Sequence, residues 1–222
     1  MSGLRVGVVC GHFDPARDGV ADYTRRLTAH LRERGAEPWT VTAHRYATEG
    51  EHVVGVTQNW RPSGVSTAAR AITRERFDVV HIQFAPSAFG FSRAVGLLPV
   101  LLPRELPVLV TLHEYDKYAP RTLRELRTAG WSMLERAGLA DRETLVLVPR
   151  AARLIVTNRE HAALLTGRWP GRRSTVSEIP IGPNIEPTPG VDRERVRLEV
   201  RRRLGVAADS PIVVFFGFLH PV

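Results

Sequence analysis

His113 and Glu114 are the residues whose position in this sequence most directly suggests chemistry. They follow a short apolar run, 108–112, which opens after Pro107 and is rich in valine. Such a run predicts a fully buried parallel strand, and ligands of open α/β sheets bind beyond the carboxyl ends of the strands. We therefore expect His113 at that edge, with its imidazole turned toward a substrate. The alternative is a histidine that caps the strand through local hydrogen bonds.

A second polar pair interrupts another apolar run, 77–84. His81 and Gln83 are two residues apart, so they share one face of the predicted strand. Two interpretations remain open: the pair faces the cleft, or neighbours at the end of the strand satisfy it. The loop that follows, 85–91, is rich in Gly, Pro and aromatic residues.

The loop 11–19 contains Asp14, ends at Gly19 and leads into a predicted helix over 20–34. A strand, a glycine-containing loop and a helix N-terminus form a layout that receives phosphate or another anion. The loop has neither the GxGxxG spacing nor the P-loop spacing, so it is not a dinucleotide or Walker fingerprint. Either Asp18 or Gly19 is expected to cap the helix.

Strands and helices alternate through most of the chain. This alternation predicts an α/β fold with a Rossmann-like, doubly wound parallel sheet and right-handed crossovers. The apolar face of the first helix is expected to comprise Val20, Tyr23, Leu27 and Leu31. The predicted strands are 4–10, 38–43, 53–56, 77–84, 108–112, 153–157 and 175–179, and the predicted helices are 20–34, 63–76, 92–102, 121–137, 141–149 and 159–165.

The composition is that of an ordinary globular protein, with a basic balance. Hydrophobic residues make up 43% of the 222 residues, charged residues make up 24%, and the formal net charge is +8. A basic balance favours anionic partners. The sequence has no C2H2 pattern, no recognisable helix-turn-helix and no basic groove interleaved with aromatics, so we expect no nucleic-acid partner. The single cysteine, Cys10, excludes an internal disulfide and fits a reducing compartment.

The predicted helix 121–137 carries several arginines around an apolar face. A solvated helix surface is the first interpretation. The alternative is a basic amphipathic helix that rests on anionic lipid. The N-terminus does not resemble a signal peptide, so we expect a cytoplasmic location. The basic helix adds the alternative of peripheral contact at the inner membrane face.

The last forty residues differ in character from the rest. Residues 181–210 comprise an interdomain linker, which begins dense in Pro and Gly, and a basic helix over 192–204. Residues 211–216 predict a buried strand that has no partner in its own domain, and 211–222 are interpreted as the start of a second domain. The first domain is therefore expected to cover 1–180.

Five stretches, in order, resemble the amino-terminal half of GT-B-fold glycosyltransferases of family 4, which are retaining and use nucleotide sugars. They resemble the glycine-containing loop with the first helix, the Asp-Val-Val-His strand, the strand that ends in the active-site histidine, the hinge motif, and the start of the donor-binding domain. The stretches are 18–27, 77–83, 110–114, 179–185, and 202–205 with 213–217.

The resemblance implies specific roles for individual residues. His113 would face the transferred sugar and help to hold the transition state, and Gly19 would lie against the donor diphosphate or the acceptor. Gly217 would open the loop of the second domain that meets the diphosphate. The remaining donor- or acceptor-binding candidates are Asp14, Val20, His81 and Glu114. The chain departs from the family at Asp18, where a glycine is common.

The implied reaction is hexosyl transfer from a nucleotide sugar to a glycan or lipid acceptor. No metal and no other cofactor is expected, because the sequence lacks an Asp-x-Asp motif and a metal-ligand spacing. The basic residue and the carboxylate pair of the family's donor site are also missing. This chain would therefore carry the acceptor-side half and need a donor-binding domain, further along the chain or in another chain. The alternative is a non-catalytic module that binds a glycan, a lipid or a partner transferase.

Overall fold

The computed structural model describes residues 3–47, 52–115, 124–183 and 188–215. The chain divides into two compact units, Met1–Ile181 and Gly182–Val222. The first unit carries the sheet and the second carries one helix.

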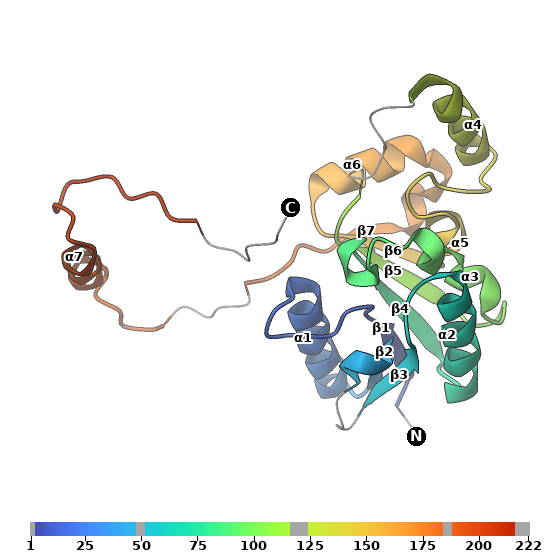
Figure 1. The fold of residues 1–222 in the computed structure, drawn as a ribbon, viewed down its shortest axis with the longest axis horizontal. Coiled ribbons are helices and arrows are strands. Elements are labelled where there is room, and N and C mark those ends of the chain that lie inside the picture. Colours follow the sequence, from blue (N-terminus) through green and yellow to red (C-terminus); the bar gives the residue numbers. More distant parts are fainter. Residues whose placement is uncertain (1–2, 48–51, 116–123, 184–187, 216–222) are drawn as a thin grey trace. The chain divides into compact units, whose positions relative to one another are not determined.

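The sheet of the first unit has seven strands, all parallel, in the order β3-β2-β1-β4-β5-β6-β7 (Figure 1). The chain winds outward from β1 to β3 and then crosses over to β4, so the strand order reverses between β1 and β4. This confirms the predicted fold class, an α/β, Rossmann-like, doubly wound parallel sheet. The strands are β1 (Arg5–Val9), β2 (Glu37–Ala43), β3 (Val53–Thr57), β4 (Val79–Phe84), β5 (Val108–Leu112), β6 (Arg153–Val156) and β7 (Val176–Glu178).

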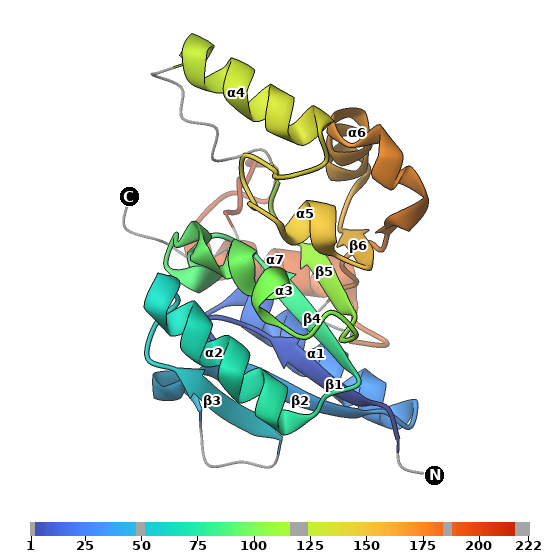
Figure 2. The same cartoon turned by 90° about the vertical axis from the view of Figure 1, so that its right-hand side faces the viewer.

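Helices cover both faces of the sheet. Figures 1 and 2 show α1 (Gly19–Glu33) on one face and α2 (Pro62–Glu75), α3 (Leu98–Leu101) and α5 (Leu147–Arg150) on the other. The unit also contains α4 (Arg124–Arg136) and α6 (Arg159–Arg168) and the short 3-10 turns η1 (His44–Tyr46), η2 (Ser87–Phe89), η3 (Arg93–Leu97) and η4 (Pro170–Thr175).

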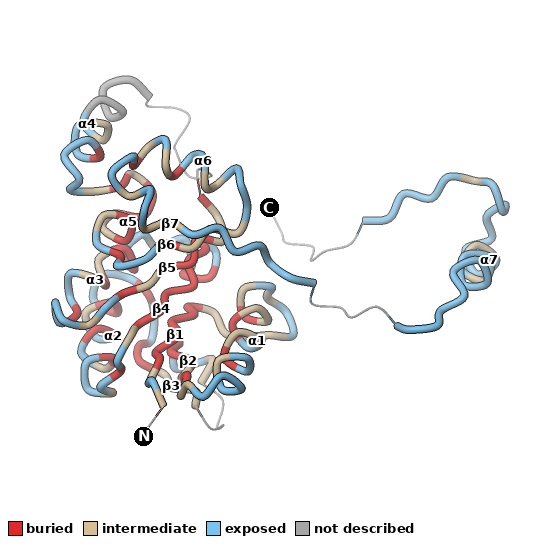
Figure 3. The backbone as a smooth tube through the Cα atoms, turned by 180° about the vertical axis from the view of Figure 1, so that it is seen from behind, coloured by how far each residue is buried: buried red, intermediate tan, exposed pale blue. Residues whose placement is uncertain are grey.

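The two faces of the sheet are built from different kinds of side chain. The apolar core lies on the face covered by α2, α3 and α5, and buried residues run along the strands (Figure 3). Small and polar side chains, Ala21, Thr24 and Thr28, are the buried ones on α1. The apolar face predicted for this helix is only half-buried, because the small residues let α1 approach the sheet and leave the larger ones at its flanks. The half-buried residues are Val20, Tyr23, Leu27 and Leu31.

Local capping signals in the sequence are confirmed. The Asp18 side chain accepts a hydrogen bond from the backbone N–H of Ala21 at 2.8 Å, and Asn158 accepts one from the N–H of His161 at 2.8 Å. Each bond satisfies a donor that a helix start leaves unpaired. Asp18, the departure from the family pattern, therefore has a structural role at the start of α1.

Two predicted helices are wrong in their extent. Residues 92–102 form η3 followed by the single turn of α3. In the predicted helix 141–149, only α5 is helical, because the Asp141 side chain accepts hydrogen bonds from the N–H groups of Glu143 and Thr144 and holds a tight turn. The predicted helix 121–137 is observed as α4, but residues 121–123 and the side chains of 124–129 lie outside the described structure. The basic face assigned to that helix falls largely among them.

The second unit contains α7 (Arg193–Leu204), which has no buried residue among those described. Asp192 caps its start, and Gly205, at φ +66°, ends it. The strand predicted over 211–216 is not formed at 211–215, where the backbone has no strand partner and Val213 is 97% exposed. A strand needs a neighbour to pair with, and the described residues of this unit supply none; Phe216 lies outside the description.

Candidate functional site

The loops that follow β1 and β4 meet at the carboxyl edge of the sheet, where the strand order reverses. In open α/β sheets this reversal is where ligands bind. A Cβ atom added at Gly11 would overlap the carbonyl oxygen of Ala88 and the ring of Phe89. A glycine is therefore required at position 11 for the two loops to pack this closely.

The carbonyl oxygen of Gly11 ties this junction to the ends of β2 and β3. It accepts a hydrogen bond from the indole Nε1–H of Trp60 at 3.0 Å and a longer one, 3.4 Å, from the Thr42 hydroxyl. Trp60 is 5% exposed and packs edge-on against Phe89. The Ser92 hydroxyl donates to the carbonyl oxygen of Trp60 at 2.6 Å. Four loops are thus held together by buried aromatic packing and by hydrogen bonds.

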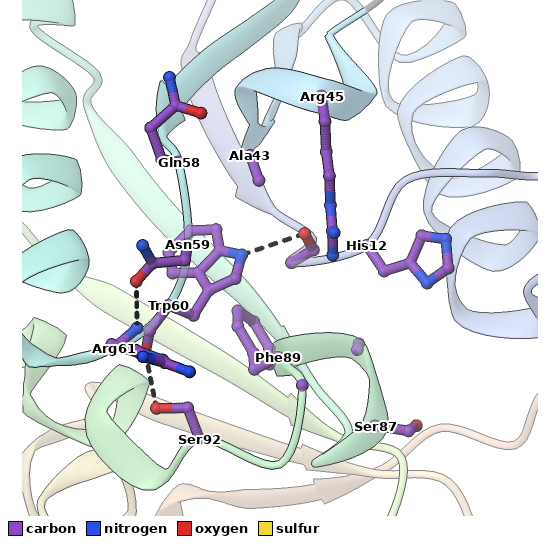
Figure 4. Close-up of a pocket in the computed structure, with 13 residues that line it drawn as sticks. His12, Ala43, Arg45, Gln58, Asn59, Trp60, Arg61, Ser87, Phe89 and Ser92 are labelled. Carbon is purple, nitrogen blue, oxygen red and sulfur yellow. Dashed lines mark hydrogen bonds between the residues drawn. The ribbon is translucent and has the colours of Figure 1, made fainter.

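These four loops enclose a cavity of about 220 Å³ at the carboxyl edge (Figure 4). Its floor is Gly11 with the buried Trp60 and Phe89. Polar side chains surround the opening, and the His12 ring stacks on Tyr46 with the ring centres 4.3 Å apart. The polar side chains of the lining are His12, Arg45, Gln58, Asn59, Arg61, Ser87 and Ser92.

A row of polar side chains lies on the α1 face of β4 and β5, and we call it the histidine ladder: His81, Gln83, Thr111 and His113. Strand register pairs Gln83 with Thr111, so all four face the same side. His81 Nε2 lies 2.8 Å from the Thr111 hydroxyl, and His113 Nε2 lies 2.9 Å from Gln83 Oε1. The Tyr23 ring of α1 packs edge-on against the His113 ring at 4.9 Å.

Burial keeps both histidines of the ladder neutral. Desolvation lowers the pKa of His81 to about 4. The pKa of His113 is also lowered to about 4, by burial and by the neighbouring His81. The charged imidazolium loses its hydration in such a place, so the neutral form is favoured. At neutral pH, His113 therefore acts through hydrogen bonds of an uncharged ring.

Gln83 selects the tautomer of His113. An amide oxygen can only accept, so the Nε2 atom of His113 carries the proton and donates it to Oε1. That leaves the lone pair on Nδ1, the second ring nitrogen. This orientation leaves the Nε2 atom of Gln83 buried and without a hydrogen-bond partner among the described residues, which is energetically unfavourable.

A second buried cluster, which we call the Asp141 network, lies next to the end of β5. Asp141 is fully buried. Its Oδ2 accepts from the Tyr115 hydroxyl at 2.7 Å and from the Trp169 indole at 3.0 Å. Arg168 donates to the same Tyr115 oxygen and, at 2.9 Å, to Glu143. Burial and the adjacent Asp141 raise the pKa of Tyr115.

The Asp141 network anchors the segment that carries His113, since Tyr115 follows it by two residues. Sequence reasoning missed this cluster because its members come from three separate segments. The one local signal was Asp141 followed by Glu143 and Thr144, which is an Asx-turn pattern.

The predicted site residues are only partly brought together. His113 is half-buried at the carboxyl end of β5, and Glu114 is half-buried beside it. His81 is 7% exposed and bonded to Thr111, which corresponds to the interpretation of a satisfied strand pair. The structure thus places His81 in the interior of the first unit.

The candidates near α1 lie at the start of that helix. Asp14 is half-buried, and its carbonyl oxygen accepts from the N–H groups of Arg17 and Asp18. Val20 is half-buried. Gly19 is exposed, and a Cβ atom added there would meet nothing within 4 Å, so no close packing within this chain demands a glycine. Gly217 lies outside the described residues.

Within the described parts of the chain, no group of three or more His, Cys, Asp and Glu side chains is arranged to hold a metal ion. None of the described helices is both long enough and apolar enough to cross a bilayer.

With this geometry established, the family assignment rests on a direct match. The sequence model described as Glycosyltransferase Family 4 matches residues 17–186. The chain belongs to this family. The match includes α1, the whole histidine ladder and the Asp141 network, and it confirms the resemblance to the amino-terminal domain of GT-B glycosyltransferases. No curated relative matches the sequence.

Solved structures of similar fold are also glycosyltransferases. One is an alpha-glucosyltransferase in complex with UDP-glucose and DNA containing an abasic site, with 15% identity and a TM-score of 0.47; the alignment covers 80% of this chain and 42% of that one. Another is an alpha-glucosyltransferase in complex with UDP, with 16% identity and a TM-score of 0.45, over 88% of this chain and 46% of that one. This family 4 chain therefore spans less than half the length of these enzymes.

The expectation that nucleic acid is excluded as a partner is wrong. A further similar structure is an alpha-glucosyltransferase in complex with UDP and a 13-mer DNA that contains an HMU base, with 14% identity and a TM-score of 0.46, over 89% of this chain and 45% of that one. The exclusion depended on the lack of a helix-turn-helix, a zinc-finger spacing or an aromatic-lined groove. The DNA in these structures is bound by the similar enzymes, and the lack of those three patterns in this sequence is no ground for excluding a nucleic-acid partner.

Proposed function

We propose that this chain is the acceptor-side half of a retaining glycosyltransferase, which transfers a hexosyl group from a nucleotide sugar to an acceptor. The observation that carries the proposal is His113, neutral and held in one tautomer at the carboxyl end of β5, in a chain of Glycosyltransferase Family 4. A cytoplasmic location is part of the proposal and is supported by the single buried Cys10.

A neutral His113 suits this role for an electrostatic reason. Glycosyl transfer passes through a transition state in which the sugar ring resembles an oxocarbenium ion and carries positive charge. An imidazolium would repel that charge, whereas a neutral ring accepts a hydrogen bond from a sugar hydroxyl through the Nδ1 lone pair. The low pKa of His113 and its bond to Gln83 both favour this form.

In this proposal the cavity at the carboxyl edge receives the acceptor. It lies where the strand order reverses, and it is lined entirely by residues of the first unit. The leaving diphosphate needs positive charge or backbone dipoles aimed at it, and a donor-binding domain would supply these across a closed cleft that excludes water. The proposal assigns no metal or other cofactor.

The test is His113→Ala in a complete, two-domain enzyme that contains this chain. We expect turnover to fall at least tenfold, a loss of about 1.4 kcal/mol or more in transition-state stabilisation, with little change in Tm. The isolated 222-residue chain is expected to show no transfer. Unchanged turnover in His113→Ala would remove the role assigned to His113, and a complete protein with no transferase activity would favour the non-catalytic binding module.

A further inference from the structure

Among the described residues, the lining of the carboxyl-edge cavity contains two guanidinium groups and no carboxylate. Arg45 lies in η1, directly after β2, and Arg61 lies at the start of α2 (Figure 4). Both side chains are exposed, so both remain hydrated and charged while they border the cavity.

Several other arginines of the same unit are paired with carboxylates. Arg142 pairs with Glu135 at 2.7 Å, Arg168 pairs with Glu143 at 2.9 Å, and Arg5 pairs with Glu37 at 3.3 Å. Within residues 3–47, 52–115 and 124–183, no ion pair joins Arg45 or Arg61 to a carboxylate. Arg45 instead lies over the Tyr46 ring, 4.6 Å from its centre.

The walls around these two groups are fixed by close packing. A Cβ atom added at Gly64 would overlap the carbonyl oxygen of Asn59, so the turn before α2 is packed as tightly as the turn at Gly11. The Asn59 side chain accepts from the N–H of Arg61 at 3.0 Å and fixes the backbone from which this side chain extends. A preorganised cavity loses less entropy when it binds a ligand.

Phe91 is the residue between two that line the cavity. Phe91 follows Gly90 and precedes Ser92, both of which line the cavity. It is 63% exposed and adopts φ +59°, in the left-handed region that bulky residues rarely occupy. Backbone strain of this kind clusters at ligand sites.

We propose that this cavity binds a small ligand through a compact oxyanion, such as a phosphate monoester, held by Arg45 and Arg61. Guanidinium groups bind phosphate through two parallel hydrogen bonds. The volume, about 220 Å³, is below the roughly 300–1,000 Å³ of pockets for drug-sized ligands, so the cavity fits one ring or headgroup and not a long glycan. That the ligand is the sugar acceptor rests on the proposed function, whereas the binding itself does not.

The test is calorimetric titration of the 222-residue chain with glucose 6-phosphate, inorganic phosphate and glucose, all at one ionic strength. We expect glucose 6-phosphate to bind at least tenfold more tightly than glucose. The double variant Arg45→Gln with Arg61→Gln should weaken that binding at least tenfold. Arg70→Gln, an exposed arginine of α2 outside the cavity, is the matched control and should change it less than twofold. An unchanged Tm shows that the variants are folded.

Two further arms identify the source of the oxyanion. Co-sedimentation with vesicles that contain phosphatidic acid, lost only in the double variant, would assign the phosphate to a lipid headgroup; no co-sedimentation would assign it to a soluble ligand. Equal affinity for glucose and glucose 6-phosphate, or an equal loss in Arg70→Gln, overturns the proposal. The proposal is also overturned if a short single-stranded DNA binds more tightly than both phosphate probes and the double variant abolishes this binding. Because the readout is binding, these failures leave the test of turnover at His113 intact.

Discussion

Two buried polar clusters lie at the end of β5, and they satisfy their polar groups to different degrees. In the Asp141 network, the carboxylate accepts from Tyr115, Trp169 and the turn at Thr144, and Arg168 supplies positive charge nearby. In the histidine ladder, the rings are neutral and the NH2 group of Gln83 has no partner in the part of the chain that the structure describes. A buried cluster whose polar groups are all hydrogen-bonded makes the structure rigid. A cluster that keeps a polar group without a partner is a candidate for binding a ligand.

The largest expected difference comes from removing the central acceptor of the Asp141 network. Asp141→Ala should lower the free energy of unfolding by about 3–5 kcal/mol, the range for breaking a buried charged cluster. Tyr115 and Trp169 lose their acceptor, and Arg168 keeps Glu143 but loses a nearby negative charge. Urea unfolding followed by circular dichroism measures it. Glu199→Gln, which breaks an exposed pair with Arg203, should cost less than about 1 kcal/mol. Equal losses in the two variants would mean that the network is not an anchor.

Acid pH should weaken the histidine ladder. His81 and His113 have a pKa of about 4 in the folded chain against 6.5 for an unperturbed histidine. Between these values the unfolded chain binds protons that the folded chain does not. Their contribution to stability is therefore complete above about pH 6.5 and is lost as the pH falls toward 4, by at most about 1.4 kcal/mol per pH unit for each histidine.

The measurement is urea unfolding at pH 7, 6 and 5. His81→Gln should reduce the slope with pH, and His30→Gln, at an exposed position of α1, is the control that should retain it. An identical slope in His81→Gln would show that this ring does not titrate as described.

The smallest change in stability is expected at Gln83, the residue whose hydrogen bonding distinguishes the histidine ladder from the Asp141 network. Gln83→Leu removes a buried NH2 group that has no partner among the described residues, and such a group costs about 1–3 kcal/mol. The same change leaves the His113 Nε2–H without its acceptor. These two effects oppose each other, so the free energy of unfolding should change by less than about 1.5 kcal/mol.

The tautomer of His113 should nevertheless change, which ¹⁵N NMR of the imidazole detects. Thr111→Val is the matched control, since it removes the partner of His81 and leaves the bond between Gln83 and His113. A large loss of stability in Gln83→Leu with the tautomer preserved would make Gln83 a structural residue only.

The sequence and the structure agree where the signal is local. Alternation correctly placed His81 and Gln83 on one face, and Asp18, one of the two candidates for the cap of the first helix, is the residue that caps it. The apolar runs predicted the strands of the sheet within a few residues, because a buried parallel strand is apolar on both faces.

The features that were missed depend on segments far apart in the chain. The Asp141 network joins residues 115, 141, 143, 168 and 169, and no spacing rule connects them. The cavity forms only when the loops after β1, β2, β3 and β4 converge at Gly11. The sequence left open whether His81 faces a cleft or is satisfied by its neighbours, because its environment depends on how closely α1 packs, which the small residues Ala21, Thr24 and Thr28 decide.

The exposed run at the end of the second unit has a consequence for handling this chain. Val213, Val214 and Phe215 are 97%, 78% and 76% exposed, and their backbone has no strand partner. Short segments with high β-propensity and no charge pair readily with copies of themselves. These three side chains could fill the interior of a neighbouring sheet, so we expect aggregation of this chain to increase with its concentration.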